Sequence, residues 1–287
     1  MNRSDFRFAD PLRVRWAEVD MQKVVFNGHY LMYVDTAMGN YWRALALPYE
    51  ATLAALDGDL FVRKSTLEYL APAHYDDSLE VGIRFGSAGT SSLRFVAAVF
   101  RGEELLVHGE VVYVWTDART RRPKAAPAAL VDAFRAHAAG EPMVSVQVGT
   151  WSDLAAEAQP IRTTVFVDEQ KVPVEIERDA ADADAVHALA RNRLGLAVGT
   201  GRLLAAAGPG HPARIGRMAV SRGLRGARIG RDLLEALMAA AGRRGDAEVT
   251  LHAQVSALGF YRRAGFVEHG ERFEEAGIGH QEMRRKP

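Results

Sequence analysis

The sequence contains no cysteine among its 287 residues. This absence excludes disulfides, thiolate metal sites and cysteine nucleophiles. The nine histidines do not take over as metal ligands, because none falls in a His-Glu-x-x-His or similar ligand spacing. We therefore expect no metal site in this protein.

An excess of one charge sign is also absent. The chain has 36 Lys and Arg against 36 Asp and Glu, which gives a formal net charge of zero at pH 7. A protein without an overall field does not recruit nucleic acid or an anionic membrane, so any anion must bind at a local patch. We expect neither nucleic acid nor a membrane among its partners.

Long hydrophobic runs are missing as well. Residues 1–16 carry no apolar core of a signal peptide, and no later run approaches the roughly 18 apolar residues that a membrane span needs. We expect a soluble cytoplasmic protein. Its length is that of about two domains, each large enough for its own core.

The first half of the chain predicts one long helix against a sheet. Apolar and polar residues alternate from Leu12 to Ala17, which is typical of a strand. From His29 to about Leu45 the apolar residues recur at helical spacing, and the apolar face of that helix needs a sheet to cover it. A meander of antiparallel strands is predicted at residues 61–70, 79–85, 93–100 and 105–115.

Two segments in this half resemble a known signature. Residues 14–20 (VRWAEVD) and 24–30 (VVFNGHY) are similar to those of the hydroxybenzoyl-CoA-type thioesterases, which have the hotdog fold. The resemblance implies that Asp20 is the catalytic aspartate and that the amide of Asn27, at the helix start, is the donor to the thioester oxygen. Lys23 departs from the signature, since a glycine is usual three residues after the aspartate.

The chemistry of thioester hydrolysis fits these residues. The carbonyl oxygen develops negative charge in the transition state, which a preorganised N–H donor stabilises. Asp20 then acts as general base on water or as nucleophile through an anhydride, and the sequence does not separate the two. A purely structural role also stays open, because aspartates after strands often cap turns.

A linker separates the halves. Between residues 119 and 141 two prolines precede a short alanine-rich helix that ends near Gly140. We place the domain boundary there, which gives domains of ordinary size at residues 1–140 and 141–287.

The second half contains a predicted anion site. The apolar residues from Ile215 to Val220 read as a strand whose alternation is broken, as a bulge breaks it. A glycine-rich basic turn follows and leads into an amphipathic helix that begins near Ile229. Glycines let the backbone come close, and the free N–H groups and dipole of a helix start favour an anion. The alternative is an ordinary solvated basic turn.

Two motifs here resemble the GNAT acetyltransferases. Residues 225–230 (RGARIG) are similar to the acetyl-CoA pyrophosphate loop Arg/Gln-x-x-Gly-x-Gly/Ala, with Arg228 at the place of the middle glycine, and residues 260–266 (FYRRAGF) are similar to Phe-Tyr-x-x-x-Gly-Phe. The resemblance implies that Tyr261 donates a proton to the leaving thiolate. It also implies that acetyl-CoA binds at Met218, Val220, Arg225, Gly226, Arg228, Ile229 and Gly230.

An acidic loop precedes this region. Residues 166–170, the loop and His187 resemble a bacterial subgroup of GNAT proteins, in which this region lies toward the acceptor. Acidic side chains there would attract an amine, which makes Glu177 and His187 candidates for a catalytic role. A charge run is more often a solvated surface. The carboxylates of the loop are Glu175, Glu177, Asp179, Asp182 and Asp184.

Taken together, the sequence predicts an α+β chain with two enzymes. An N-terminal hotdog domain hydrolyses an acyl-CoA to free acid and CoA, and a C-terminal GNAT α/β domain with a mixed sheet passes the acetyl group of acetyl-CoA directly to an amine. Acyl-CoA and acetyl-CoA are substrates, no cofactor is bound permanently, and the acyl chain and the amine are unidentified. The hotdog resemblance implies a homodimer or homotetramer. Because of Lys23 and Arg228, an alternative stays open in which one half is only a CoA-sensing or dimerisation module.

Overall fold

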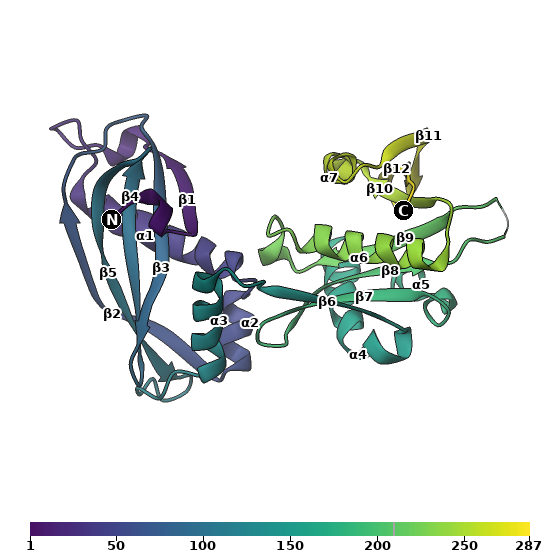
Figure 1. Cartoon of the computed structure of the whole chain (residues 1–287), viewed down its shortest axis with the longest axis horizontal. Coiled ribbons are helices and arrows are strands. Elements are labelled where there is room, and N and C mark those ends of the chain that lie inside the picture. Colours follow the sequence, from purple (N-terminus) through teal and green to yellow (C-terminus); the bar gives the residue numbers. More distant parts are fainter. Residues whose placement is uncertain (209) are drawn as a thin grey trace. The chain divides into compact units, whose positions relative to one another are not determined.

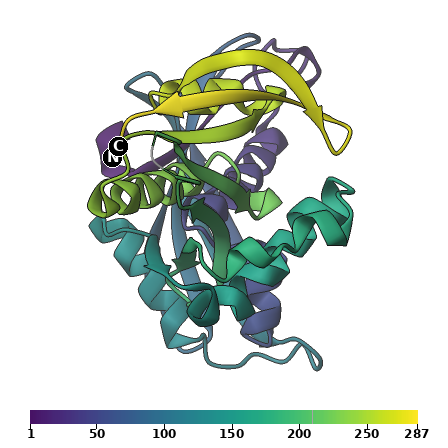
Figure 2. The same ribbon diagram turned by 90° about the vertical axis from the view of Figure 1, so that its right-hand side faces the viewer.

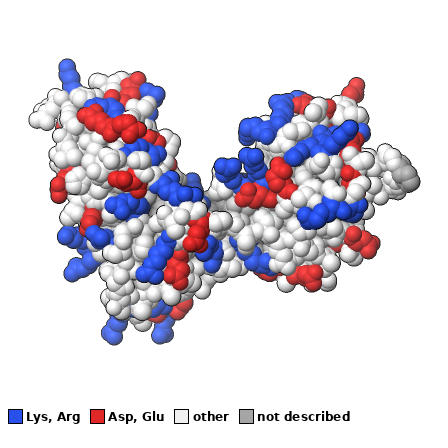
Figure 3. Space-filling view, viewed as in Figure 1, with Lys and Arg blue, Asp and Glu red and all other residues white. Residues whose placement is uncertain are grey.

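The computed structural model of the protein describes residues 1–208 and 210–287. The chain divides into two compact units, Met1–Met143 and Val144–Pro287 (Figure 1). Acidic and basic side chains are interspersed over the face of each unit that Figure 3 shows. Among the described residues, no helix combines the length and apolarity that crossing a bilayer requires.

The first unit is a five-stranded antiparallel sheet with a long helix on it. The strands lie in the order β1-β3-β4-β5-β2, and helix α1 (Asn27–Ala44) contacts β3 and β1 through its apolar stripe. The predicted arrangement of one helix against antiparallel strands is confirmed. The strands are β1 (Phe8–Arg13), β2 (Gly58–Tyr69), β3 (Ser78–Ala88), β4 (Ser92–Arg101) and β5 (Glu104–Asp117).

Two details of that prediction are wrong. The strand expected to run to Ala17 ends at Arg13, and Trp16 lies in a 3₁₀ turn with 74% of its surface exposed. The Trp16 ring packs edge-on against Tyr75 instead of entering the core. The apolar residues therefore alternate beyond the end of the strand, and the pattern overestimates its length. Only β3, β4 and β5 form a meander, since β2 pairs with β5 at the sheet edge.

Helix α3 (Ala128–Ala139) closes the first unit. Its Phe134 ring lies 5.1 Å from the Phe95 ring and 5.4 Å from the Phe85 ring, so the helix shares the aromatic core of the sheet. It ends, as predicted, at Gly140, which has φ +82°, the left-handed conformation that glycine adopts most easily. A short helix that the sequence did not predict, α2 (Tyr49–Ala55), precedes β2.

The second unit is a seven-stranded mixed sheet. Its order is β11-β12-β10-β9-β8-β7-β6, and only β9 and β10 are parallel. Helix α4 (Trp151–Arg162) and helix α6 (Ile229–Arg244) cover opposite faces of it (Figure 1). The strands are β6 (Val144–Gly149), β7 (Val186–Asn192), β8 (Ala197–Leu204), β9 (Ala213–Val220), β10 (Val249–Gln254), β11 (Val267–Glu275) and β12 (Ile278–Arg285).

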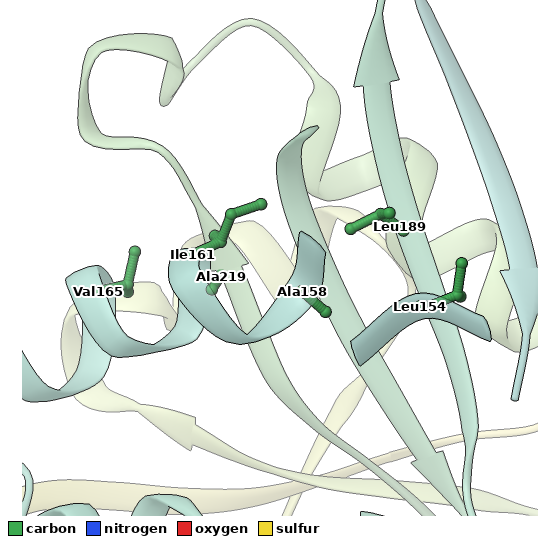
Figure 4. Packing of buried hydrophobic residues seen from close by; sticks show 6 residues of the cluster. All are labelled: Leu154, Ala158, Ile161, Val165, Leu189 and Ala219. Carbon is green, nitrogen blue, oxygen red and sulfur yellow. The ribbon is translucent and has the colours of Figure 1, made fainter. Parts of the chain in front are cut away.

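Helix α4 begins earlier than the sequence predicted. Its start at Trp151 was hidden by Pro160, because an internal proline is usually read as a helix boundary. The helix continues into a π-helical segment, Thr163–Glu169. Figure 4 shows the cluster that joins this helical segment to the sheet: Leu154, Ala158, Ile161 and Val165 of the helical segment pack with Leu189 of β7 and Ala219 of β9.

Strands β9 and β10 separate after a short pairing. Their register covers three pairs and ends at Ile215 and Leu251. The predicted bulge is confirmed by an extra residue of β9 opposite β8, at Arg217, which has φ +54°. Beyond this point the edge of β9 that faces β10 pairs with no strand of the described chain, and the sheet opens.

Candidate active sites

The predicted site of the first unit begins with a tight turn. The backbone N–H of Asp20 donates to the carbonyl oxygen of Val24 at 2.9 Å, and the backbone N–H of Lys23 donates to the carbonyl oxygen of Asp20 at 3.0 Å. Lys23 has φ +63°, in the left-handed region that favours glycine. Lys23 thus adopts a glycine-like conformation at the position where the thioesterase signature has a glycine.

The carboxylate of Asp20 is half-buried in this turn. Its Oδ1 accepts the N–H of Gln22 at 2.8 Å, which is the turn-capping role that the sequence left open. The other carboxylate oxygen, Oδ2, has no hydrogen bond to any residue that the structure describes. Capping and catalysis are therefore compatible, since one oxygen orients the group and the other stays available.

Asn27 lies where the prediction needs it, as the first residue of α1. The preceding segment is anchored by the Phe26 N–H, which donates to the Glu18 oxygen at 2.9 Å. No side chain caps the helix, and within the described chain neither the Asn27 nor the Gly28 amide has an acceptor. A helix start with free N–H groups and a positive dipole end stabilises a developing oxyanion.

Sequence reasoning missed a buried polar pair behind this turn. The Tyr33 hydroxyl donates to Glu18 Oε2 at 2.7 Å, and that carboxylate also accepts the Arg15 N–H at 2.8 Å. Burial, together with the hydrogen bond to Glu18, raises the pKa of Tyr33. The pair joins α1 to the segment that carries Asp20. The sequence gives no indication that Glu18 is buried, because a single glutamate in an alternating segment is expected on the exposed face.

The second unit holds a cleft of about 220 Å³ where β9 and β10 separate. Its walls come from the π-helical segment, from helices α5 (Val174–Glu177) and α7 (Leu258–Arg263), and from the end of the β11–β12 hairpin. Met218 and Tyr261, two of the predicted site residues, line the cleft.

The start of α6 forms a cradle of backbone amides. Gly226 has φ +93° and Arg228 has φ +66°, so both adopt left-handed conformations that bend the chain into the helix. Four amides in this turn have no acceptor among the residues described. They belong to Gly226, Arg228, Ile229 and Gly230, the residues predicted to bind pyrophosphate. Free amides at the start of a 16-residue helix make an anion site.

Arg225 is arranged differently from the prediction. Its Nε donates to the Val220 oxygen at 3.1 Å, and its terminal nitrogen pairs with Glu169 at 2.6 Å. The guanidinium therefore holds the end of β9 against the π-helical segment. Because Glu169 compensates its charge, the positive field at the cradle comes mainly from the helix start and the other arginines.

Tyr261 is almost fully buried in α7. Its ring packs edge-on against Phe260 and Phe266, with centroids 4.8 and 6.0 Å away. Burial raises the pKa of Tyr261 to about 12, so the hydroxyl keeps its proton at neutral pH. The hydroxyl has no hydrogen bond to the part of the chain that the structure covers, which leaves the proton available to a ligand in the cleft.

The acidic loop does not present unpaired carboxylates to this cleft. Glu177 is buried against Arg162, and Asp182 binds Arg162 and Arg202 at 2.9 and 2.8 Å. Asp179 binds Arg202 and, at 3.0 Å, Arg217. Burial alone raises the pKa of Asp182, but the two guanidinium groups outweigh it and hold that pKa below its usual range. The expectation that this loop attracts an amine is wrong for these three residues.

His187 also has a structural role. Its ring is 1% exposed and lies against Trp151, and its Nε2 atom shares a 3.0 Å hydrogen bond with the backbone carbonyl oxygen of Asp182. Burial lowers the pKa of His187, so the ring stays neutral. His187 does not line the cleft, and the carboxylate of Glu177, although this residue borders the cleft, is buried in its ion pair with Arg162. Sequence reasoning instead missed His252 and Glu275, which line the cleft and contact each other.

Comparisons with known proteins match each half of the chain separately. The family model described as "Thioesterase-like superfamily" matches residues 14–134, and the one described as "Acetyltransferase (GNAT) domain" matches residues 153–287. The first half is 32% identical over 136 residues to "Acyl-CoA thioester hydrolase YbgC" of Shigella flexneri, a match that covers 47% of this chain and 99% of the relative.

The second half has relatives of its own. It is 34% identical over 124 residues to "Uncharacterized N-acetyltransferase YjcF" of Bacillus subtilis, covering 43% of this chain and 86% of the relative. Among solved structures, an "Acyl-CoA N-acyltransferase" from Pseudomonas aeruginosa is 34% identical and covers 50% of this chain and 99% of its own, with a TM-score of 0.45.

Proposed function

Since the chain belongs in its first half to the thioesterase-like superfamily and in its second half to the GNAT acetyltransferases, we propose that it carries two enzymes for coenzyme A thioesters. Residues 1–140 hydrolyse an acyl-CoA to the free acid and CoA. Residues 141–287 transfer the acetyl group of acetyl-CoA to an amine. Both thioesters are substrates, and the chain works in the cytoplasm.

The hydrolytic site is the turn at Asp20 and the start of α1. The carbonyl oxygen of the thioester accepts the free N–H of Asn27, which stabilises the negative charge of the transition state. Asp20 attacks or activates water with the carboxylate oxygen that does not cap the turn. The observation that carries this proposal is the unpaired amide of Asn27 close in sequence to an aspartate with an available oxygen.

The transferase site is the cleft between β9 and β10. The pyrophosphate of acetyl-CoA binds the cradle of Gly226, Arg228, Ile229 and Gly230. The rest of the acetyl-CoA molecule lies along the unpaired edge of β9 at Met218 and Val220. The amine attacks the carbonyl carbon directly, without an acyl-enzyme. Tyr261 gives its proton to the departing thiolate.

The first test separates the two activities. Free CoA is measured with a thiol-reactive dye across a panel of acyl-CoAs, with and without amines, for the wild type and Asp20→Asn. The asparagine keeps an oxygen for the Gln22 N–H but has no carboxylate, so hydrolysis should fall at least ~100-fold while acetyl transfer persists.

The matched control for this test is Asp132→Asn, which removes an exposed carboxylate of α3. This control should hydrolyse like the wild type. A loss below threefold in Asp20→Asn on the best substrate would reject Asp20 as catalytic. If acetyl-CoA binds but no amine in the panel is acetylated, the second half is a CoA-sensing module.

A further inference from the structure

Two residues of the transferase cleft that the motifs do not include form an ion-pair geometry. His252 lies on β10 and Glu275 at the end of β11, and both line the cleft. The Nδ1 atom of His252 is 3.2 Å from Oε2 of Glu275. The β11–β12 hairpin, yellow in Figure 2, brings Glu275 back toward β10, because β12 pairs with both strands.

The surroundings hold the imidazole in one orientation. The ring of Phe273 lies edge-on to it, with centroids 4.8 Å apart. The His252 side chain keeps 29% of its surface exposed, so a ligand in the cleft can reach it. Nε2 has no hydrogen bond to a described residue. An Nδ1–H donated to Glu275 leaves the lone pair on Nε2, which is the arrangement of a general base with an orienting carboxylate.

We propose that His252, positioned by Glu275, is the base that takes the proton of the acceptor amine during acetyl transfer. The inference rests on the proposed function of the second half and adds the residue that completes its chemistry. It gives the hairpin a role in catalysis, since Glu275 belongs to it.

The amine nitrogen forms a bond to the carbonyl carbon and gives one proton to Nε2 of His252. The carbon–sulfur bond breaks, its electron pair leaves with sulfur, and the sulfur takes the proton of Tyr261. Glu275 stabilises the imidazolium that forms. Solvent then removes the proton from His252 and restores that of Tyr261.

Other titratable groups at the cleft do not fit this role. The carboxylate of Glu177 is buried in an ion pair with Arg162. His280 is also buried, and its Nδ1 atom lies 2.7 Å from the backbone carbonyl oxygen of Ile278. The charged and titratable groups that face His252 or border the cleft around it are Glu275, Glu282, His280, Arg202, Arg214, Arg217, Glu177 and Tyr261. A pH profile of the rate must therefore be compared between variants rather than read alone.

The test uses the full chain with an amine that the wild type acetylates, and follows His252→Gln and Glu275→Gln. For His252→Gln, kcat should fall roughly 100- to 10,000-fold, with the KM for acetyl-CoA unchanged, and the acidic limb of the pH profile should disappear. For Glu275→Gln, kcat should fall less, again with the KM for acetyl-CoA unchanged, because the imidazolium has lost the carboxylate that stabilises it.

His269→Gln is the matched control, because His269 also contacts a glutamate, Glu282, but lies outside the cleft. It should change the rate less than twofold. A His252→Gln variant that keeps a third of the rate overturns the assignment, and so does one that loses acetyl-CoA affinity in parallel. If the wild type acetylates no amine, the transferase function itself fails, and the inference fails with it.

Discussion

Lys23 and Arg228 are the two residues that depart from the motifs of their families, and both have left-handed backbone conformations, at φ +63° and φ +66°. A side chain there costs roughly 1–2 kcal/mol relative to glycine. Despite this cost in stability, both loops have the left-handed backbone conformation that glycine adopts most easily. The departures therefore do not argue against either proposed active site, since neither proposal assigns a role to the side chain of Lys23 or Arg228.

The hydroxyl of Tyr261 is the next group to test. Tyr261→Phe keeps the buried ring and removes only the donor, so kcat for acetylation should fall roughly 10- to 1,000-fold with little change in acetyl-CoA affinity. With a pKa of about 12, the hydroxyl stays protonated through neutral and mildly basic pH. Stopped-flow or steady-state rates measure the effect, and hydrolysis by the first half is the internal control. An unchanged kcat, with chemistry rate-limiting, removes Tyr261 from the mechanism.

At the scale of elements, the start of α6 depends on Gly226. Its φ of +93° is a conformation that L side chains rarely adopt, although an added Cβ would meet no atom within 4 Å. Gly226→Ala should distort the cradle at a cost of roughly 1–3 kcal/mol, which raises the KM for acetyl-CoA about tenfold or more.

Gly223→Ala provides the control in the same turn. Gly223 also has open space around it, but it lacks a positive φ. The substitution should leave the KM for acetyl-CoA within about twofold of the wild type, since surface changes without strain have small effects. Equal KM values for the two alanine variants would show that the conformation of the cradle does not govern binding.

Elements with a regular apolar pattern were predictable, and those with a conflicting local signal were not. Helices α1 and α6 follow the helical spacing of their apolar residues, whereas Pro160 hid the first part of α4. Likewise, the amides at residues 226–230 were found because they are contiguous in sequence. The contact between His252 and Glu275 was not, because only the pairing of β10, β12 and β11 brings these residues together.

At the scale of the whole molecule, we expect the chain to self-associate through its first unit as a homodimer or homotetramer. Among the described residues, strand β2 pairs only with β5, so the other edge of this long strand is free, and its Phe61, Val62 and Tyr69 side chains are exposed. Such an edge is a template for pairing with another chain. Sedimentation at micromolar concentration should show the oligomer, and Val62→Lys should weaken it. A monomeric wild type with full hydrolytic activity would refute the prediction.

The central claim is that one chain contains two independent active sites for CoA thioesters. The most direct measurement is product analysis by mass spectrometry for the wild type, Asp20→Asn, Tyr261→Phe and the double variant, each given acyl-CoA, acetyl-CoA and an amine. We predict that Asp20→Asn loses the free acid and keeps the N-acetyl amine, that Tyr261→Phe does the reverse, and that the double variant loses both. Loss of both products in either single variant would contradict the account.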